Sequence, residues 1–366
     1  MTGVHGFRPL LKWPGGKTRE WPALAPYVPW DVRHLVDPFM GGLAPFALTP
    51  FSGRAHLSDL HPRLVALHVL TQRQDAEFLA ACDALAAAWD ALGPLAAQLA
   101  PAFEALLQSA REGERAPDAA SALSDAPRAL EDDAFAPRLA ASLADKALRL
   151  ARLELRHAVR FEGAECARHG ETAVRAAFYG LVREREHGAT GAAAAADFLF
   201  VREYCYGSMF RQNADGAFNI PYGGASYNAK PFARKVERLR DPRTVAALAR
   251  AEFACGDFGS VLADLAPHLE RRDLVFLDPP YDSDFSAYGG NEFGIAEHER
   301  LADLMARLPC RYLFVIKETA DVRRIYVEGA PARAGGRVVL RFGKTYGYNV
   351  RGRNDRDARH VVLTNA

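Results

Sequence analysis

The sequence predicts an α/β fold, a doubly wound sheet interrupted by an inserted helical domain. Short apolar runs alternate with helical stretches in the first 70 residues and again after residue 250, as in sheets of mainly parallel strands. Between about residues 70 and 200, Ala, Leu, Arg and Glu dominate and apolar positions recur at helical spacing. Together these patterns favour one α/β domain with a long helical insertion.

The expected elements follow in chain order. Five short apolar runs that end in polar or turn residues predict buried strands: residues 35–38, 54–58, 252–255, 274–277 and 312–316. Residues 295–308 predict a helix, and residues 338–342 and 361–364 predict a closing β-ribbon. Four prolines are expected to divide the insertion into several helices: Pro101, Pro117, Pro127 and Pro137.

Composition limits the class of protein. The chain has 366 residues, 49% of them hydrophobic, which is enough for a sizeable core. Its five cysteines are scattered without a CxxC pair, which argues against a disulfide framework and a thiolate zinc site. We identify no uncharged apolar run of about 18 residues and no signal-peptide pattern, so we expect a cytoplasmic protein outside the membrane. The net charge of +1 is unevenly distributed, because residues 75–150 carry 13 acidic and 6 basic residues.

The strongest chemical signal is the string Val-Phe-Leu-Asp-Pro-Pro-Tyr at residues 275–281. An apolar strand there delivers the Asp278 carboxylate to the edge at which open α/β sheets bind their ligands. Pro279 and Pro280 lack backbone donors, so carbonyl groups of this loop remain available as acceptors, and Tyr281 offers a flat ring. We expect a socket for a planar group with an exocyclic amine, in which Asp278 and a proline-loop carbonyl accept the two N–H groups.

Two glycine-containing segments lie upstream. Residues 11–18 read Leu-Lys-Trp-Pro-Gly-Gly-Lys-Thr and lack the first glycine of a phosphate-binding P-loop. Trp13 is suited to cover a cation or an aromatic ring, and Lys17 to hold a carboxylate. Residues 35–42 predict a strand that turns into a glycine loop, the position at which Rossmann-like folds admit a nucleoside-containing cofactor. Asp59 follows about 20 residues later, where an acidic side chain reaches ribose hydroxyls.

These motifs, in this order, resemble the Dam-type (D12 class) DNA adenine-N6 methyltransferases. Four segments carry the resemblance: residues 13–17, 37–42, 206–223 and 278–281. It implies a Rossmann-like sheet that binds S-adenosylmethionine. It also implies an enzyme that methylates a flipped adenine in double-stranded DNA without a metal and releases S-adenosylhomocysteine. It also implies a cofactor-binding and catalytic domain of residues 1–70 and 245–366. Residues 71–244 would form the helical insertion and target-recognition region, with a DNA-contacting hairpin at about 204–230.

The resemblance implies roles for individual residues. Those implied in cofactor binding are Trp13, Lys17, Asp37, Phe39, Gly41, Asp59, Asp257, Phe258 and Asp278. Those implied in catalysis are Asp278, Pro279, Pro280 and Tyr281, with the Tyr281 ring as the platform for the flipped base. Those implied in DNA contact on the hairpin are Arg211, Asn213 and Asn219. From two basic clusters, at residues 230–240 and 341–359, we further expect phosphate contacts by Lys230, Arg351 and Arg353.

Several alternatives stay open. The methyl acceptor could be cytosine N4 or adenine in RNA, or the chain could be a catalytically silent DNA-binding protein on the same scaffold. Restriction-modification, phage defence and genome marking are all compatible biological settings. We expect the acidic insertion to face away from DNA or to bind a protein partner. Eight histidines without metal-like grouping are expected at the surface or at helix caps: His56, His61, His68, His157, His169, His187, His298 and His360.

Overall fold

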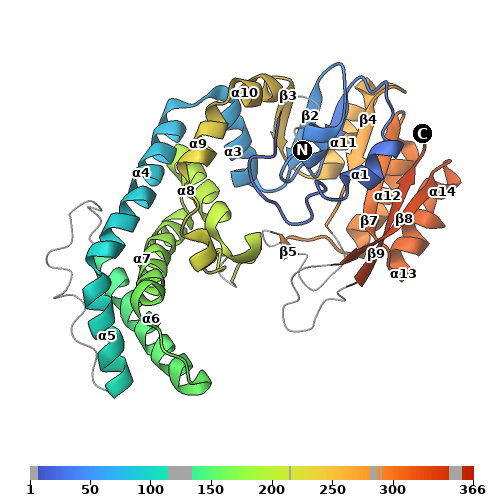
Figure 1. The fold of residues 1–366 in the computed structure, drawn as a ribbon. Helices are drawn as coiled ribbons and strands as arrows, with labels where there is room; N and C mark the ends of the chain where they lie inside the picture. Colours follow the sequence, from blue (N-terminus) through green and yellow to red (C-terminus); the bar gives the residue numbers. More distant parts are fainter. Residues whose placement is uncertain (1–6, 114–133, 214–215, 281–286, 289–290, 346–356) are drawn as a thin grey trace. The chain divides into compact units, whose positions relative to one another are not determined.

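The computed structural model describes residues 7–113, 134–213, 216–280, 287–288, 291–345 and 357–366. The chain forms two compact units. The first, here called the sheet unit, comprises Met1–Gln74 with Leu239–Ala366, and the second, here called the helical unit, comprises Asp75–Arg238. Figure 1 shows the elements of both units, and each unit is described by itself.

A seven-stranded, mostly parallel sheet is the centre of the sheet unit, as the sequence predicts. Its strands, in spatial order, are β3 (Ala251–Cys255), β2 (Ala55–Asp59), β1 (Leu35–Asp37), β4 (Leu274–Leu277), β7 (Arg311–Lys317), β9 (Asp357–Thr364) and β8 (Arg337–Thr345). The first five run parallel, whereas β9 is antiparallel to both β7 and β8. The predicted closing ribbon is therefore confirmed. A separate antiparallel pair joins β5 (Ala287–Tyr288) and β6 (Asn291–Glu292).

The strand order reverses at β1. Strands β2 and β3 lie on one side of β1, and β4 and β7 lie on its other side. Because these strands are parallel, the carboxyl ends of β1 and β4 form a topological switch point, the place at which α/β sheets bind their ligands. Asp37 ends β1 and Asp278 directly follows β4, so both carboxylates belong to this switch point.

Helices cover the sheet on both faces (Figure 1). The helical segments of the sheet unit are α1 (Trp21–Leu24), η1 (Ala25–Tyr27), α2 (Ala44–Leu48), α3 (Pro62–Arg73), α10 (Pro242–Leu248), α11 (Phe258–Leu265), η5 (Ala266–His268), α12 (Ile295–Arg307), α13 (Ala320–Val322), the π-helix Arg323–Val327 and α14 (Ala330–Arg333). On one face, Val275 and Leu277 of β4 pack in a cluster with Leu262 and Leu301. On the other face, the centres of the Phe276 and Trp21 rings lie 5.9 Å apart. Burial on both faces explains the uninterrupted apolar run of β4.

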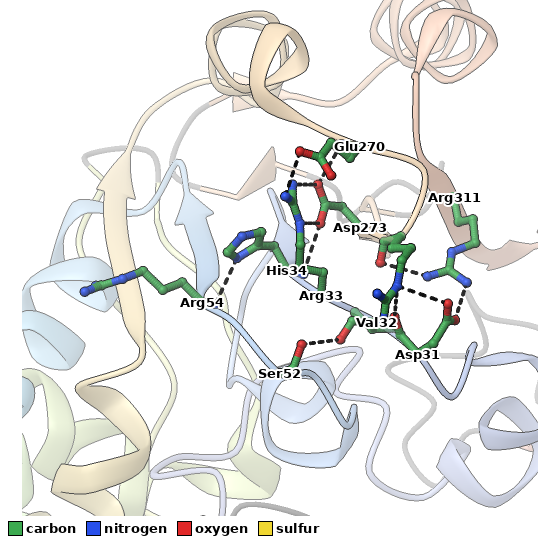
Figure 2. A network of polar contacts seen from close by, with 10 residues as sticks. Asp31, Val32, Arg33, His34, Ser52, Arg54, Glu270, Asp273 and Arg311 are labelled. Carbon is green, nitrogen blue, oxygen red and sulfur yellow. Dashed lines mark hydrogen bonds and ion pairs between the residues drawn. The ribbon is translucent and has the colours of Figure 1, made fainter.

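A polar network ties together the amino ends of the central strands (Figure 2). Asp273, just before β4, is fully buried and accepts two hydrogen bonds from the Arg33 guanidinium, at 2.9 and 2.8 Å. The backbone N–H groups of His34 and Glu270 also donate to Asp273. Nearby, Arg311 at the start of β7 donates to Asp31 at 2.6 Å. This end of the sheet is fixed by ion pairs, at the opposite strand ends from the switch point.

The helical unit contains long helices. They are α4 (Ala76–Gln98), α5 (Ala100–Glu112), α6 (Phe135–His157), α7 (Gly163–Glu186) and α8 (Gly191–Tyr204), with the short turns η3 (Tyr206–Ser208) and η4 (Ala225–Tyr227). Helix α9 (Ala233–Arg240) spans the boundary between the units. Pro101 and Pro137 lie in the first turns of α5 and α6, as expected of helix-breaking prolines, whereas Pro117 and Pro127 lie outside the described residues. Pro94 lies inside α4.

Helix α4 is, among the described residues, the one helix long and apolar enough to cross a membrane, and its Phe78, Leu92 and Trp89 side chains are buried in the helical unit. One sequence expectation is corrected, which concerns the histidines expected at the surface or at caps. His68, His298 and His360 are buried, because they lie on the inner faces of α3, α12 and β9.

Candidate active site

The two strongest sequence motifs meet through an ion pair. The Lys17 ammonium contacts Oδ2 of Asp278 and also donates to the carbonyl of Gly15 at 2.7 Å. Lys17 is 1% exposed and Asp278 is 16% exposed, so the pair is largely removed from water. The sequence suits Lys17 to hold a carboxylate, and Asp278 supplies one. Segments 261 residues apart are thereby joined at the switch point. No finding tests the cofactor contact that the resemblance implies for Lys17.

The glycine loop after β1 packs directly against Trp13. Gly41 has a φ of +45°, and a Cβ built there would lie 2.8 Å from Cδ1 of Trp13. A Cβ at Gly42 would lie 3.1 Å from the carbonyl oxygen of Leu11. Glycine is therefore required at position 41 by both conformation and space. The structure thus brings the segment around Trp13 and the predicted cofactor loop together.

Asp59 links the end of β2 to this loop. Its Oδ2 accepts a hydrogen bond from the N–H of Gly41 at 3.1 Å, and its Oδ1 accepts one from the N–H of His61 at 2.9 Å. His61 begins α3 as its N-cap and packs edge-on against Trp13, with ring centroids 5.5 Å apart. Burial raises the pKa of Asp59, and the two N–H groups act in the opposite direction.

Asp37 is the most deeply buried acid at the switch point. Its Oδ1 accepts from the N–H of Phe39 at 3.1 Å, while its buried Oδ2 has no hydrogen-bond partner among the residues that the structure describes. Burial raises the pKa of Asp37 well above its usual value, and the nearby carboxylates of Asp278 and Asp59 raise it further. The Phe39 N–H and Lys17 act in the opposite direction without offsetting burial. A donor or a positive charge that reaches Oδ2 would satisfy this atom.

Three phenylalanines gather beside the loop. Phe39 lies 5.4 Å from Phe258 and 5.8 Å from Phe293, and Phe258 lies 5.5 Å from Phe293, measured between ring centroids. Phe39 and Phe258 were predicted as cofactor residues. Phe293 was missed, because it lies between two elements and belongs to no motif that the sequence reveals.

Asp257 serves as the N-cap of α11. Its Oδ1 accepts from the N–H groups of Gly259 and Ser260, and the carboxylate pairs with Arg300 of α12. The Arg300 guanidinium also lies 4.2 Å from the centre of the Phe258 ring. Burial acts to raise the pKa of Asp257, but Arg300 and the N–H groups outweigh it and the net pKa is lowered. Asp257 is thus anionic and 36% exposed, with Arg300 as a partner that sequence inspection did not identify.

The helical unit holds the predicted hairpin. Gln212 and Phe218 form an antiparallel bridge, and the N–H of Asn219 donates to the carbonyl of Arg211 at 3.1 Å. Nε of Arg211 donates to Oδ1 of Asn219 at 2.8 Å, and Oδ1 of Asn213 accepts from the N–H of Ala217. The three hairpin residues predicted to contact DNA therefore lie on the two arms of one turn.

Comparison with known proteins supports the family resemblance of the motifs. The family model described as D12 class N6 adenine-specific DNA methyltransferase matches residues 164–334. The chain is similar to this family, as its motifs predict. The D12 match spans the hairpin, β3, α11 and β4 with Asp278.

Parts of the chain are also similar to known methyltransferases. A DNA N-6-adenine-methyltransferase of Escherichia phage P1 is 31% identical over 43% of this chain and 20% of the relative. The Type II methyltransferase M.CviBI of Paramecium bursaria Chlorella virus NC1A is 30% identical over 36% of this chain and 47% of the relative. The Retron Ec67 DNA adenine methylase of Escherichia coli is 34% identical over 30% of this chain and 34% of the relative. The chain thus spans between a fifth and about half of the length of these relatives.

The remaining predicted catalytic and DNA-contact residues are only partly described by the structure. Pro279 is buried directly after Asp278, whereas Tyr281, Arg351 and Arg353 lie outside the described residues. The Lys230 ammonium lies 2.6 Å from the Glu203 carboxylate, which also pairs with Lys235. No finding tests the DNA contact predicted for Lys230.

Proposed function

We propose that the chain is a site-specific DNA adenine-N6 methyltransferase that methylates a flipped adenine in double-stranded DNA. The observation that carries this proposal is the ion pair between Lys17 and Asp278 at the switch point. It joins the Asp-Pro-Pro loop to the segment whose Trp13 ring packs on the glycine loop after β1, and this supports a meeting of methyl donor and acceptor there. The D12 similarity supports the same reaction.

The residues at the switch point fit S-adenosylmethionine. The Oδ2 atom of Asp37, buried without a described partner, suits the ammonium group of a methionine moiety. Gly41 lets the Trp13 ring approach the loop backbone closely, so this ring lies beside the proposed cofactor site. We assign the ribose hydroxyls to Asp59 and the cofactor adenine to the surroundings of Phe39, Asp257 and Phe258. The bound cofactor supplies an electrophilic sulfonium methyl group and is released as S-adenosylhomocysteine.

The role of Asp278 is to orient the acceptor nitrogen. The exocyclic amine of adenine is a poor nucleophile, because its lone pair is delocalised into the ring. When Asp278 and a proline-loop carbonyl accept its two N–H bonds, the nitrogen becomes more tetrahedral and its lone pair is aimed at the methyl group. Lys17 holds the Asp278 carboxylate in place through their ion pair. As the new C–N bond forms, the nitrogen must lose a proton, which Asp278 can pass to water.

The helical unit is assigned to DNA. We propose that Arg211, Asn213 and Asn219 present the hairpin to the duplex and that the adenine is extruded onto Tyr281. The region from 71 to 244 then acts as helical insertion and target-recognition region, while the segments 1–70 and 245–366 bind the cofactor and carry catalysis. We further propose a cytoplasmic location and a protein partner for the acidic part of the insertion.

Labelled S-adenosylmethionine incubated with mixed DNA duplexes tests this function. We expect incorporation as N6-methyladenine, and Asp278→Ala should abolish it because the nitrogen is no longer oriented. The exposed Asp303→Ala variant on α12 is the matched control and should keep full activity. Circular dichroism and thermal unfolding establish that Asp278→Ala still folds.

The alternatives give different results in the same assay. Label in N4-methylcytosine, or in RNA instead of DNA, would overturn the proposed acceptor. Duplex binding without any incorporation would identify a catalytically silent DNA-binding protein. Near-normal activity of Asp278→Ala would contradict the role of this carboxylate.

A further inference from the structure

A buried arginine lies at the base of the hairpin. Arg202, in the last turn of α8, is 1% exposed. Its Nη1 donates to the carbonyl of Met209 at 2.5 Å and its Nη2 donates to the carbonyl of Ser208 at 2.9 Å. An arginine is rarely this deeply buried unless its charge and its N–H groups are used. Here they are used to hold backbone carbonyls of the segment that leads into the hairpin.

The same guanidinium contacts both arms of the hairpin. It lies 5.3 Å from the centre of the Phe210 ring and 5.6 Å from the centre of the Phe218 ring. The two rings belong to opposite arms and are 5.7 Å apart. Arginine is attracted to aromatic faces, and the attraction strengthens when water is excluded. Arg202 therefore joins α8, the entry of the hairpin and both of its arms.

The backbone held by Arg202 is strained. Ser208 has a φ of +54° and follows Gly207, which has a φ of +61°. A serine in this left-handed region persists only where its surroundings enforce the conformation. The hydrogen bonds from Arg202 to the carbonyls of Ser208 and Met209 are suited to enforce it. Arg211 follows only two residues after Met209.

We propose that Arg202 is a positioning residue that fixes the hairpin in the conformation that presents Arg211 and Asn219 to DNA. This inference rests on the proposed function, because it assigns a support for the DNA-contacting hairpin of that function. Arg202 sets the affinity for the duplex without touching it, since its guanidinium is covered by the segment that it holds. Arg211, by contrast, is exposed.

Duplex binding across a range of salt concentrations separates positioning from contact. We expect Arg202→Gln to weaken duplex binding about tenfold while cofactor affinity stays within about twofold. The slope of log affinity against log salt should stay unchanged, because no phosphate contact is lost, whereas Arg211→Ala should reduce it by about 1. Arg149→Gln is the matched control, since Arg149 is a 70% exposed arginine of the same unit.

A second substitution tests the strain directly. Ser208→Gly removes the penalty of the left-handed conformation, so it should have little effect alone and restore most of the binding lost in Arg202→Gln. If Arg202→Gln does not fold, Arg202→Lys with and without Ser208→Gly gives the same comparison, because lysine keeps the charge but loses the second carbonyl contact.

Each other outcome contradicts the inference. Unchanged binding by Arg202→Gln, or binding that Ser208→Gly cannot restore, removes the positioning role. A salt slope reduced by about 1 would make Arg202 a direct phosphate contact instead. If the wild-type protein methylates DNA and the Arg202 variants bind the duplex as tightly as it does, this inference alone is overturned. Wild-type protein that binds no duplex would overturn both it and the proposed function.

Discussion

At the scale of single residues, the switch point concentrates negative charge. Asp37, Asp59 and Asp278 lie close enough for Asp37 to sense the other two, and the Lys17 ammonium is paired with Asp278. Burial makes the ionised form of Asp37 costly in the unliganded protein. A cationic ligand group would lower that cost and favour the ionised form.

Asp37→Asn is predicted to stabilise the unliganded protein and to weaken the binding of the cofactor. The folded-state pKa of Asp37 is raised, so its contribution to stability is complete below the unfolded pKa and is lost as pH rises through the folded pKa. Asparagine removes this loss, so the free energy of unfolding at pH 7 should rise. The gain should shrink towards pH 4. Urea titrations across pH measure stability, and calorimetry measures the cofactor affinity, which should fall about tenfold.

Asp303→Asn, on the exposed face of α12, is the control and should show no such pH dependence. A gain in stability that is constant with pH, or unchanged cofactor affinity, would contradict the role of Asp37.

At the scale of elements, the amino ends of the strands depend on the bond between Arg33 and Asp273 (Figure 2). Arg33→Met leaves the fully buried Asp273 carboxylate without its charged partner, so we expect a loss of roughly 3 kcal/mol in unfolding free energy. Burial acts to raise the pKa of Asp273, but Arg33 and backbone N–H groups lower it overall. The pair therefore contributes stability that is lost as pH falls through the folded pKa, and the difference between variant and wild type should narrow in acid.

Arg54→Met gives the comparison. Arg54 pairs with Glu252 at 3.4 Å, and both side chains are more than half exposed. Its loss should cost less than about 1 kcal/mol. If Arg33→Met and Arg54→Met lower the denaturant midpoint by the same amount, the burial of Asp273 does not increase the contribution of its ion pair to stability.

The elements themselves are largely predictable, and their contacts are not. Strand β4 is predictable from its uninterrupted apolar run, because both of its faces are buried. Asp278 is predictable as a site residue because it directly follows the end of this strand. The partner of Lys17 could not be predicted, since it is 261 residues away and only the strand order brings it near. Arg202 looks like any charged residue of a helix end. Only the structure shows that the hairpin covers it. The burial of His68, His298 and His360 likewise appears only in the structure.

At the scale of the whole molecule, affinity for DNA should depend on salt. Because the first 75 residues and the chain after residue 150 carry the excess of basic side chains, binding to a polyanion releases counterions. Arg211→Ala should weaken binding to all duplexes, reduce the salt slope by about 1 and leave cofactor affinity unchanged. Fluorescence anisotropy at several salt concentrations measures the first two effects. An equal loss of DNA and cofactor affinity would place Arg211 outside the DNA interface.

The pair between Lys17 and Asp278 also has a consequence for synthesis. A ribosome that adds about 5–20 residues per second needs roughly 13–50 seconds to travel from the first partner to the second. Throughout that interval the growing polypeptide contains Lys17 without Asp278, and β1 lacks its neighbour β4. Under the proposed function, truncated translation products that end before codon 278 would therefore have no activity on DNA, and only chains whose synthesis has passed that point would act on the genome.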